Sequence, residues 1–232
     1  ICNAVGLKVW QVSKEKELKS IESEKKKKKM SEMVALYKDG GMKAFFESIK
    51  KEDFISEFNL DSNLKTICFS CGDISTSKND ELYIETIANA IADKIIEPVN
   101  FIVRTSPAED PIRFESLVNK FPFIKWNFPK WIQVRANHQE SWSQRIPTLE
   151  DVKQLRALLE YSDLNINMLS TMSLDFMLFD KPVINPIFGN ASNVLYDDQR
   201  FLGYAHIQHL ANSQSTKIVK DKEQLIKAIS DY

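Results

Sequence analysis

The sequence lacks several features that assign a chain to a common class of protein. It has only 6 glycines in 232 residues, with no G-x-G-x-x-G run and no Walker-type P-loop. A dinucleotide dehydrogenase or a P-loop NTPase therefore loses its main support. No apolar run approaches the roughly 20 residues that span a bilayer, and we expect no secretory leader. We find no internal repeat.

Cysteine is scarce, and neither charge sign is in excess. The chain has three cysteines, Cys2, Cys68 and Cys71. An odd number of cysteines without the regular spacing of a disulfide framework favours a reducing compartment. Cys68 and Cys71 have C-x-x-C spacing, but no helix is predicted immediately after them. No second pair of cysteines or histidines lies near them in the sequence. We interpret Cys68 as a core residue rather than a redox or zinc residue. With 31 basic and 32 acidic residues, the chain has no general attraction for nucleic acid.

The amino-terminal quarter predicts a short strand at Gly6–Val12 followed by two helices. The chain opens at Ile1, and we expect this opening to belong to the middle of a longer protein. Helices are expected over Lys14–Lys38 and, after a break at Gly40 and Gly41, over Met42–Ile55. Five lysines at 25–29 are either a patch for an anionic lipid or lipid-linked acceptor, or a solvated helix face. The neighbouring glutamates favour the solvated face.

From Leu64 onward, apolar strands alternate with helical stripes. Strands are expected at 64–72, 100–105, 121–126, 164–168, 183–184 and 217–220, and helices at about 80–95, 111–119, 150–160, 172–179, 198–210 and 223–229. This alternation predicts an α/β fold with a doubly wound parallel sheet, preceded by a helical segment. The span 127–148, which holds Trp131, His138, Trp142 and Arg145, is predicted as a long loop that is either functional or misassigned.

The stretch Asp163–Ile184 predicts a strand, a helix and a second strand, which form a parallel crossover. Ligands bind at the carboxyl ends of such strands, where Ser170 and Thr171 lie. Hydroxyls and free amides at the first helical turn suit an anion such as a diphosphate. Asp175, one turn later, is placed to accept from a ribose hydroxyl. The alternative is that Ser170 only caps the helix.

The run ST-x-x-x-D-x-x-x-x-x-KP-V-I at Ser170–Ile184 resembles the donor segment of GT-B glycosyltransferases. It is especially similar to the bacterial surface-polysaccharide branch and to CDP-glycerol glycerophosphotransferases. The resemblance implies that Ser170 and Thr171 meet the donor diphosphate and Asp175 the ribose. That family often has glycine where this chain has Leu169 and Asp180, and glutamate where it has Asp175.

The resemblance covers roughly Leu64 to the carboxyl terminus. It implies that residues 64–232 are a Rossmann-like, nucleotide-donor-binding domain. Residues 1–63 would be the end of a preceding domain plus a helical linker. The attacking hydroxyl's base is then expected from a part of the protein outside this chain.

Four further positions are expected near the donor. Arg104, in VRTSP, resembles the R-x-x-P segment of the same enzymes and would neutralise the diphosphate; a surface salt bridge is the alternative. Gly72 would let the backbone approach the ligand closely. Ser106 and Trp142 would shape the base pocket, although core packing explains Trp142 equally well.

No metal site is predicted, because no spaced aspartate motif stands in a suitable loop, and Asp197 and Asp198 are interpreted as helix caps. His206, in FLGYAHIQHL, resembles the E/Y-x-H element of these enzymes and is the one catalytic candidate. His209 is interpreted as structural.

The implied activity is transfer of a sugar from a nucleoside diphosphate to a surface glycan, with the nucleotide sugar as substrate and no cofactor. Expected partners are the donor and a glycan or lipid-linked acceptor, with no nucleic acid and with peripheral membrane contact. The oligomeric state stays open. The expected location is the cytoplasm or the inner face of the membrane. The alternatives are a CDP-glycerol or CDP-ribitol phosphotransferase, a UDP-GlcNAc 2-epimerase relative, and a non-catalytic nucleotide-binding or scaffold domain.

Overall fold

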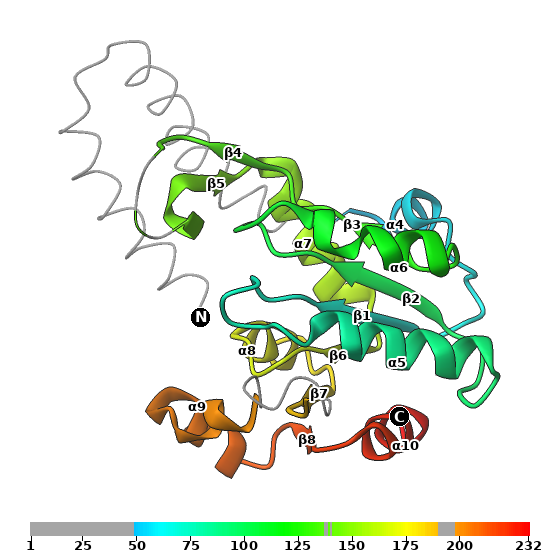
Figure 1. Cartoon of the computed structure of the whole chain (residues 1–232). Helices are drawn as coiled ribbons and strands as arrows, with labels where there is room; N and C mark the ends of the chain where they lie inside the picture. Colours follow the sequence, from blue (N-terminus) through cyan, green and yellow to red (C-terminus); the bar gives the residue numbers. More distant parts are fainter. Residues whose placement is uncertain (1–48, 137–138, 140, 190–197) are drawn as a thin grey trace, which may run out of the picture. The chain divides into compact units, whose positions relative to one another are not determined.

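The computed structural model describes residues 49–136, 139, 141–189 and 198–232, except for the side chains of Ser141, Trp142 and His206 (Figure 1). The predicted strand at 6–12, the predicted helix at 14–38 and the lysine run lie outside these residues. Residues 49–232 form one compact unit. No helix in the described part combines the length and apolar character needed to cross a membrane.

The core of this unit is a six-stranded, fully parallel sheet, as predicted. Its strands lie in the order β3-β2-β1-β6-β7-β8. Their bounds are β1 Thr66–Ser70, β2 Asn100–Arg104, β3 Lys125–Asn127, β6 Leu164–Ile166, β7 Val183–Pro186 and β8 Lys217–Val219. All five residues of β1 are buried, as are all five of β2, which is typical of strands covered on both faces.

Helices cover both faces of the sheet, so it is doubly wound. One apolar cluster joins Ile67 and Phe69 of β1 to α5, α6 and α10, and a second joins Cys68 to α4, α7 and α8. The helices are α4 Lys51–Phe58, α5 Asp80–Ala92, α6 Glu115–Lys120, α7 Leu149–Tyr161, α8 Met172–Met177, α9 Ala205–Asn212 and α10 Lys222–Ser230. The 3-10 turns are η2 Pro111–Phe114, η3 Ser141–Gln144 and η5 Asp198–Gly203.

Local chemistry explains where several helices begin. The Thr148 hydroxyl accepts from the Asp151 N–H at 3.1 Å and caps α7. The Asp221 carboxylate accepts from the Gln224 N–H at 2.7 Å and caps α10. Side-chain caps of this kind satisfy amides that the first helical turn leaves open.

Three sequence expectations need correction. Of the helix predicted over Met42–Ile55, residues 42–48 lie outside the described part; within it, α4 begins at Lys51, runs to Phe58, and turns Phe54 and Phe58 toward the core. The division at residue 63 stays a prediction. Strand β3 lies later than predicted, because Phe121 turns inward ahead of it.

The third correction concerns the predicted loop at 127–148. Strand β4, Trp131–Gln133, pairs antiparallel with β5, Arg145–Pro147. Each strand has only three residues, too short for an alternating pattern to stand out. Figure 1 shows this hairpin following β3.

Two turns flanking α8 adopt a left-handed backbone at residues with side chains. Leu169 has φ 47° and Asp180 has φ 54°. At the second turn, the Asp180 and Lys181 N–H groups donate to the Met177 and Phe176 carbonyls and close the helix. These are the two positions where the resembling family often has glycine, the residue that adopts this conformation most readily.

Candidate functional site

The strand order reverses between β1 and β6, which are neighbours in the sheet. The chain moves from β1 outward to β2 and β3 on one side, and from β6 outward to β7 and β8 on the other. In open parallel sheets ligands bind outside the carboxyl ends of the strands at such a reversal. Gly72 follows β1 at this point, and Ser170 and Thr171 follow β6, so these three residues lie at one edge of the sheet (Figure 1).

Ser170 and Thr171 differ in whether their hydroxyl groups are already used in bonds to the helix and the turn before it. The half-buried Ser170 donates its N–H to Asn167 Oδ1 at 2.7 Å, and its hydroxyl accepts from the Met172 N–H at 3.3 Å. Thr171 is exposed, and its side chain makes no capping bond to α8. The N-cap position of α8 is Thr171, so Ser170 bonds within the turn before the helix instead of capping it, and Thr171 offers the open hydroxyl.

A buried polar network, which the sequence analysis missed, supports this turn. Asn167 Oδ1 also accepts from the Ser173 hydroxyl at 3.1 Å, and Asn185 Nδ2 donates to the Asn167 carbonyl at 2.8 Å. Asn165 Nδ2 donates to Ser70 Oγ at 2.9 Å, which ties the network to β1. The three asparagines and Ser173 have no exposed surface. Such a network holds the 167–173 turn, including the left-handed Leu169, in one conformation.

Asp175 lies on α8 with its side chain partly buried. Burial raises the pKa of its carboxyl from 3.8 to about 6. Within the described residues no donor is hydrogen-bonded to this carboxylate. A carboxyl in this state is suited to accept from a ligand hydroxyl, and perturbed groups of this kind often mark functional sites.

The raised pKa of Asp175 predicts a pH-dependent stability difference. The folded protein holds the proton more tightly than the unfolded chain, so stability is lost as pH rises from about 4 through about 6. Asp175→Asn should match the wild type near pH 4 and exceed it by on the order of 1 kcal/mol at pH 7.5. Urea unfolding at both pH values measures this. Asp93→Asn, at an exposed position, is the control substitution, and a pH profile for Asp175→Asn parallel to that of the wild type would contradict the prediction.

Arg104 is bonded inside the protein rather than presented at the surface. Its Nη2 donates to Asp151 Oδ2 at 2.8 Å, its Nη1 donates to Asn127 Oδ1, and both carboxylate and guanidinium are less than 10% exposed. Its partners come from β3, which lies on the side of β2 away from β1 and β6, and from the first turn of α7. The salt-bridge alternative is therefore present, though buried rather than at the surface.

Asp151 connects several elements besides Arg104. Its carboxylate also accepts from the Lys130 N–H at 2.9 Å and from Trp131 Nε1 at 2.8 Å. The start of the β4–β5 hairpin is thereby attached to α7. Both partners of Arg104 lie far from it in sequence, which is why the spacing of residues gave no signal for this cluster.

The loop after β1 packs on itself, and this gives Gly72 a role of its own. A Cβ at position 72 would lie 2.6 Å from Ser77 Cβ. The Gly72 N–H donates to Asp80 Oδ2 at 2.8 Å, and its carbonyl accepts from Arg113 Nη2 at 2.9 Å. Burial raises the pKa of Asp80 to about 8, although Ser77, Arg113 and the Gly72 N–H oppose this rise. The close approach made possible by Gly72 is thus to its own loop.

The other predicted residues lie in the loop after β2 and on two elements, η3 and α9. Ser106 is buried after β2, and its hydroxyl accepts from the Ala108 N–H at 3.2 Å. Trp142 lies in η3 and His206 in α9, with both side chains outside the described set. His209 is exposed on α9. Their roles stay predictions.

The two cysteines after Leu64 are free thiols, and burial raises the pKa of Cys68 to about 11. Cys68 packs in the second apolar cluster, as the core interpretation requires.

Asp198, the first residue of η5, is a further buried acid, and its long-range bonds were not predicted from the sequence. Its Oδ2 accepts from the Tyr83 hydroxyl at 2.7 Å and from Asn79 Nδ2 at 3.1 Å. The Tyr83 hydroxyl also approaches the Phe188 carbonyl at 2.5 Å. The carboxylate therefore fastens the segment after β7 to the start of α5, a contact between residues more than 100 positions apart.

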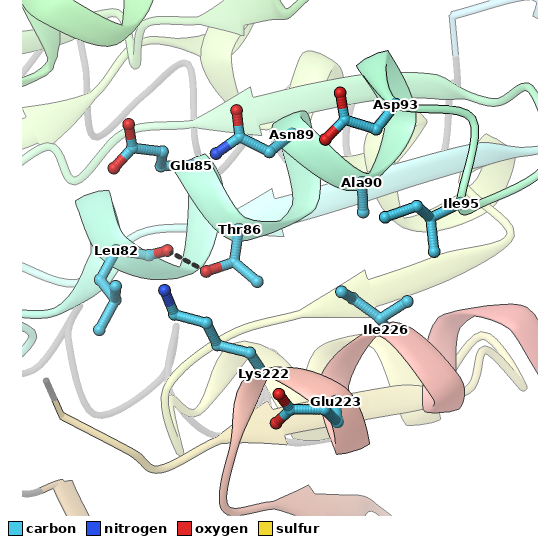
Figure 2. A pocket seen from close by; sticks show the side chains of 10 residues that line it. All are labelled: Leu82, Glu85, Thr86, Asn89, Ala90, Asp93, Ile95, Lys222, Glu223 and Ile226. Atoms are coloured by element: carbon cyan, nitrogen blue, oxygen red, sulfur yellow. Dashed lines mark hydrogen bonds between the residues drawn. The ribbon is translucent and has the colours of Figure 1, made fainter.

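A groove of about 270 Å³ lies between α5 and α10 (Figure 2). It extends along α5 from Leu82 to Ile95 and meets Lys222, Glu223 and Ile226 of α10. The Thr86 hydroxyl at its floor donates to the Leu82 carbonyl at 2.7 Å. None of the predicted site residues lines this groove, so it is separate from the carboxyl edge. Among the described residues, no three His, Cys, Asp or Glu side chains gather as a metal site.

Comparisons with known proteins give distant similarities. No family model and no curated protein matches the chain. Matching solved structures include UDP-GlcNAc 2-epimerase from Methanocaldococcus jannaschii, at 15% identity and a TM-score of 0.41 over 78% of this chain and 42% of that one. WaaG, a glycosyltransferase involved in lipopolysaccharide biosynthesis, is 14% identical with a TM-score of 0.43, over 81% and 43%.

A third match is the H444N variant of the wall teichoic acid polymerase TagF, which is 16% identical with a TM-score of 0.36. It covers 85% of this chain and 44% of that one. The chain therefore spans less than half the length of the three proteins.

Proposed function

We propose that the sheet unit binds a nucleoside diphosphate sugar at the carboxyl edge between β1 and β6. In the whole protein this donor domain would serve transfer of the sugar to a surface glycan. The observation that supports the proposal is the strand reversal, because ligands of parallel sheets bind beside such a reversal and Ser170 and Thr171 follow β6 at this edge, with Asp175 on α8.

Each residue has a separate proposed role, according to which of its polar groups is accessible to the donor. Thr171 offers its hydroxyl and the first turn of α8 to the diphosphate, and Ser170, bonded to Asn167, shapes that turn. Asp175 accepts from a ribose hydroxyl. Arg104, at the end of β2, supports the site through its buried ion pair with Asp151.

Gly72 fixes the loop beside the donor, while Ser106 and Trp142 border the base. His206 remains the catalytic candidate. The nucleotide sugar is the substrate, and no cofactor or metal enters the proposal. The acceptor is a glycan or a lipid-linked glycan. The location proposed is the cytoplasm or the inner face of a membrane, and the lysine run at 25–29 is available for peripheral contact.

Thermal unfolding of the full chain against UDP, GDP, CDP and their sugar or glycerol conjugates tests the proposal. A ligand at about 100 times its dissociation constant should add roughly 2.7 kcal/mol of stability. Thr171→Ala should lower affinity several-fold without changing unliganded stability, because its side chain makes no capping bond. Ser215→Ala, which removes an exposed hydroxyl before β8, is the matched control.

The pattern of stabilisation by UDP, GDP and CDP compounds distinguishes glycosyl transfer from the phosphotransferase alternative. A shift with UDP or GDP sugars supports glycosyl transfer from that donor. A shift confined to CDP compounds favours the phosphotransferase alternative on the same fold. No shift with any nucleotide, or equal affinities for Thr171→Ala and wild type, would contradict the proposed donor site.

A further inference from the structure

A diphosphate needs a cation, and two arginines near the carboxyl edge are already paired. Arg104 is joined to Asp151 in a buried ion pair. Arg113 lies within 3.4 Å of carboxylate oxygens of Asp80, Glu81 and Glu109. Because their charges are compensated within the protein, neither arginine needs an external anion.

Arg145, the first residue of β5, has a different environment. Its Nη1 donates to the Pro107 carbonyl at 3.0 Å, in the segment that follows β2. The side chain is half-buried, and within the described residues no carboxylate lies at ion-pair distance from it. One backbone carbonyl satisfies one of its five N–H groups, so the rest of the planar fork remains open.

The hairpin holds Arg145 at this place through several bonds. The Thr148 N–H donates to the Lys130 carbonyl at 3.0 Å, and the Asp151 carboxylate receives the Lys130 N–H and the Trp131 indole N–H. The same carboxylate holds Arg104. The buried Arg104–Asp151 pair is therefore part of the support for the strands that carry Arg145.

We propose that Arg145 is an anion-binding residue that takes a phosphate of the ligand bound at the carboxyl edge. The inference rests on the proposed function for the identity of that ligand, a nucleoside diphosphate compound. A phosphate complements a half-buried guanidinium that has no acidic partner, because it carries the opposite charge. Two of its oxygens can accept two parallel N–H bonds from the guanidinium. Recognition of the ribose is then left to Asp175, and recognition of the base to Ser106 and Trp142.

Calorimetric titration of the full chain with inorganic pyrophosphate, with UDP, GDP and CDP, and with the three nucleosides tests this inference. Arg145→Ala should weaken pyrophosphate and nucleotide binding by about 10- to 100-fold and leave nucleoside binding unchanged. Arg145→Lys should fall between, because it keeps the charge but loses the fork. Arg156→Ala, which removes an arginine paired with Glu160 on α7, should bind like wild type.

The outcomes separate this inference from the proposed function. Pyrophosphate affinity equal in Arg145→Ala and wild type, or equally reduced in Arg156→Ala, overturns the role of Arg145. Binding of pyrophosphate that depends on Arg145, without any nucleotide binding, keeps the anion site and overturns the donor proposal. A wild-type chain that binds neither overturns both. If Arg145→Ala does not fold, the comparison of Arg145→Lys with Arg145→Gln decides.

Discussion

Replacing Arg104 with alanine is expected to destabilise the domain by about 3–5 kcal/mol. The change leaves the Asp151 carboxylate, whose side chain is 2% exposed, buried without its cation. It also removes the donor to Asn127 Oδ1, inside a cluster where Asn127 in turn bonds to Gln154 at 2.6 Å. Urea unfolding with equal m-values in both proteins would measure the loss directly.

A double-mutant cycle separates the ion pair from its surroundings. Asp151→Ala should also be costly, because it releases Arg104 and the two hairpin donors together. Arg104→Ala combined with Asp151→Ala should lose less than the sum of the single changes, since neither charge is then left alone. A loss below about 1 kcal/mol for Arg104→Ala, with a large loss of nucleotide affinity, would instead support direct contact with the donor.

Tyr83→Phe is expected to be the other large effect, with a loss of about 2–3 kcal/mol. The hydroxyl donates to the Asp198 carboxylate, and both side chains are fully buried. Burial and the neighbouring carboxylate raise the pKa of Tyr83, so the hydroxyl keeps its proton and remains a donor. Removing it leaves a buried acid with weaker compensation and loosens the segment after β7 from α5. Thermal and urea unfolding would show the loss.

Tyr161 supplies the matched comparison. Its hydroxyl donates to the Ile49 carbonyl at 2.7 Å, a neutral acceptor at a partly buried place. Tyr161→Phe removes the same atom and should cost only about 1 kcal/mol. Equal losses for the two variants would show that the Asp198 carboxylate adds nothing to the Tyr83 bond.

The parts of the fold that the sequence predicted are those that local patterns determine. The run LKTICFS, apolar and β-branched at most positions, predicts β1, and the stripe at Val152, Leu155 and Leu158 with Thr148 ahead of it predicts α7. The placement of Ser170 and Thr171 at the carboxyl edge follows from the crossover rule alone. Each of these inferences needs only neighbouring residues.

What the sequence did not predict depends on pairs far apart along the chain. Arg104 and Asp151 are 47 residues apart, and Tyr83 and Asp198 are 115 apart. Asn165, Asn167 and Asn185 look like ordinary polar residues at strand ends until the sheet brings them together. The hairpin that carries Arg145 consists of two three-residue strands, too short to leave a periodic signal. Charge compensation, which distinguishes Arg145 from Arg104, is a property of the folded chain only.

The left-handed turns at Leu169 and Asp180 affect how segments of this kind can be recognised in other chains. Each turn keeps a backbone shape that favours glycine while carrying a residue with a side chain. The strain is about 1 kcal/mol per turn, which a domain with an ordinary margin of stability tolerates. The left-handed conformation at both ends of α8 therefore does not depend on glycine. A search keyed to glycine letters passes over this segment, whereas one keyed to torsion angles would find it.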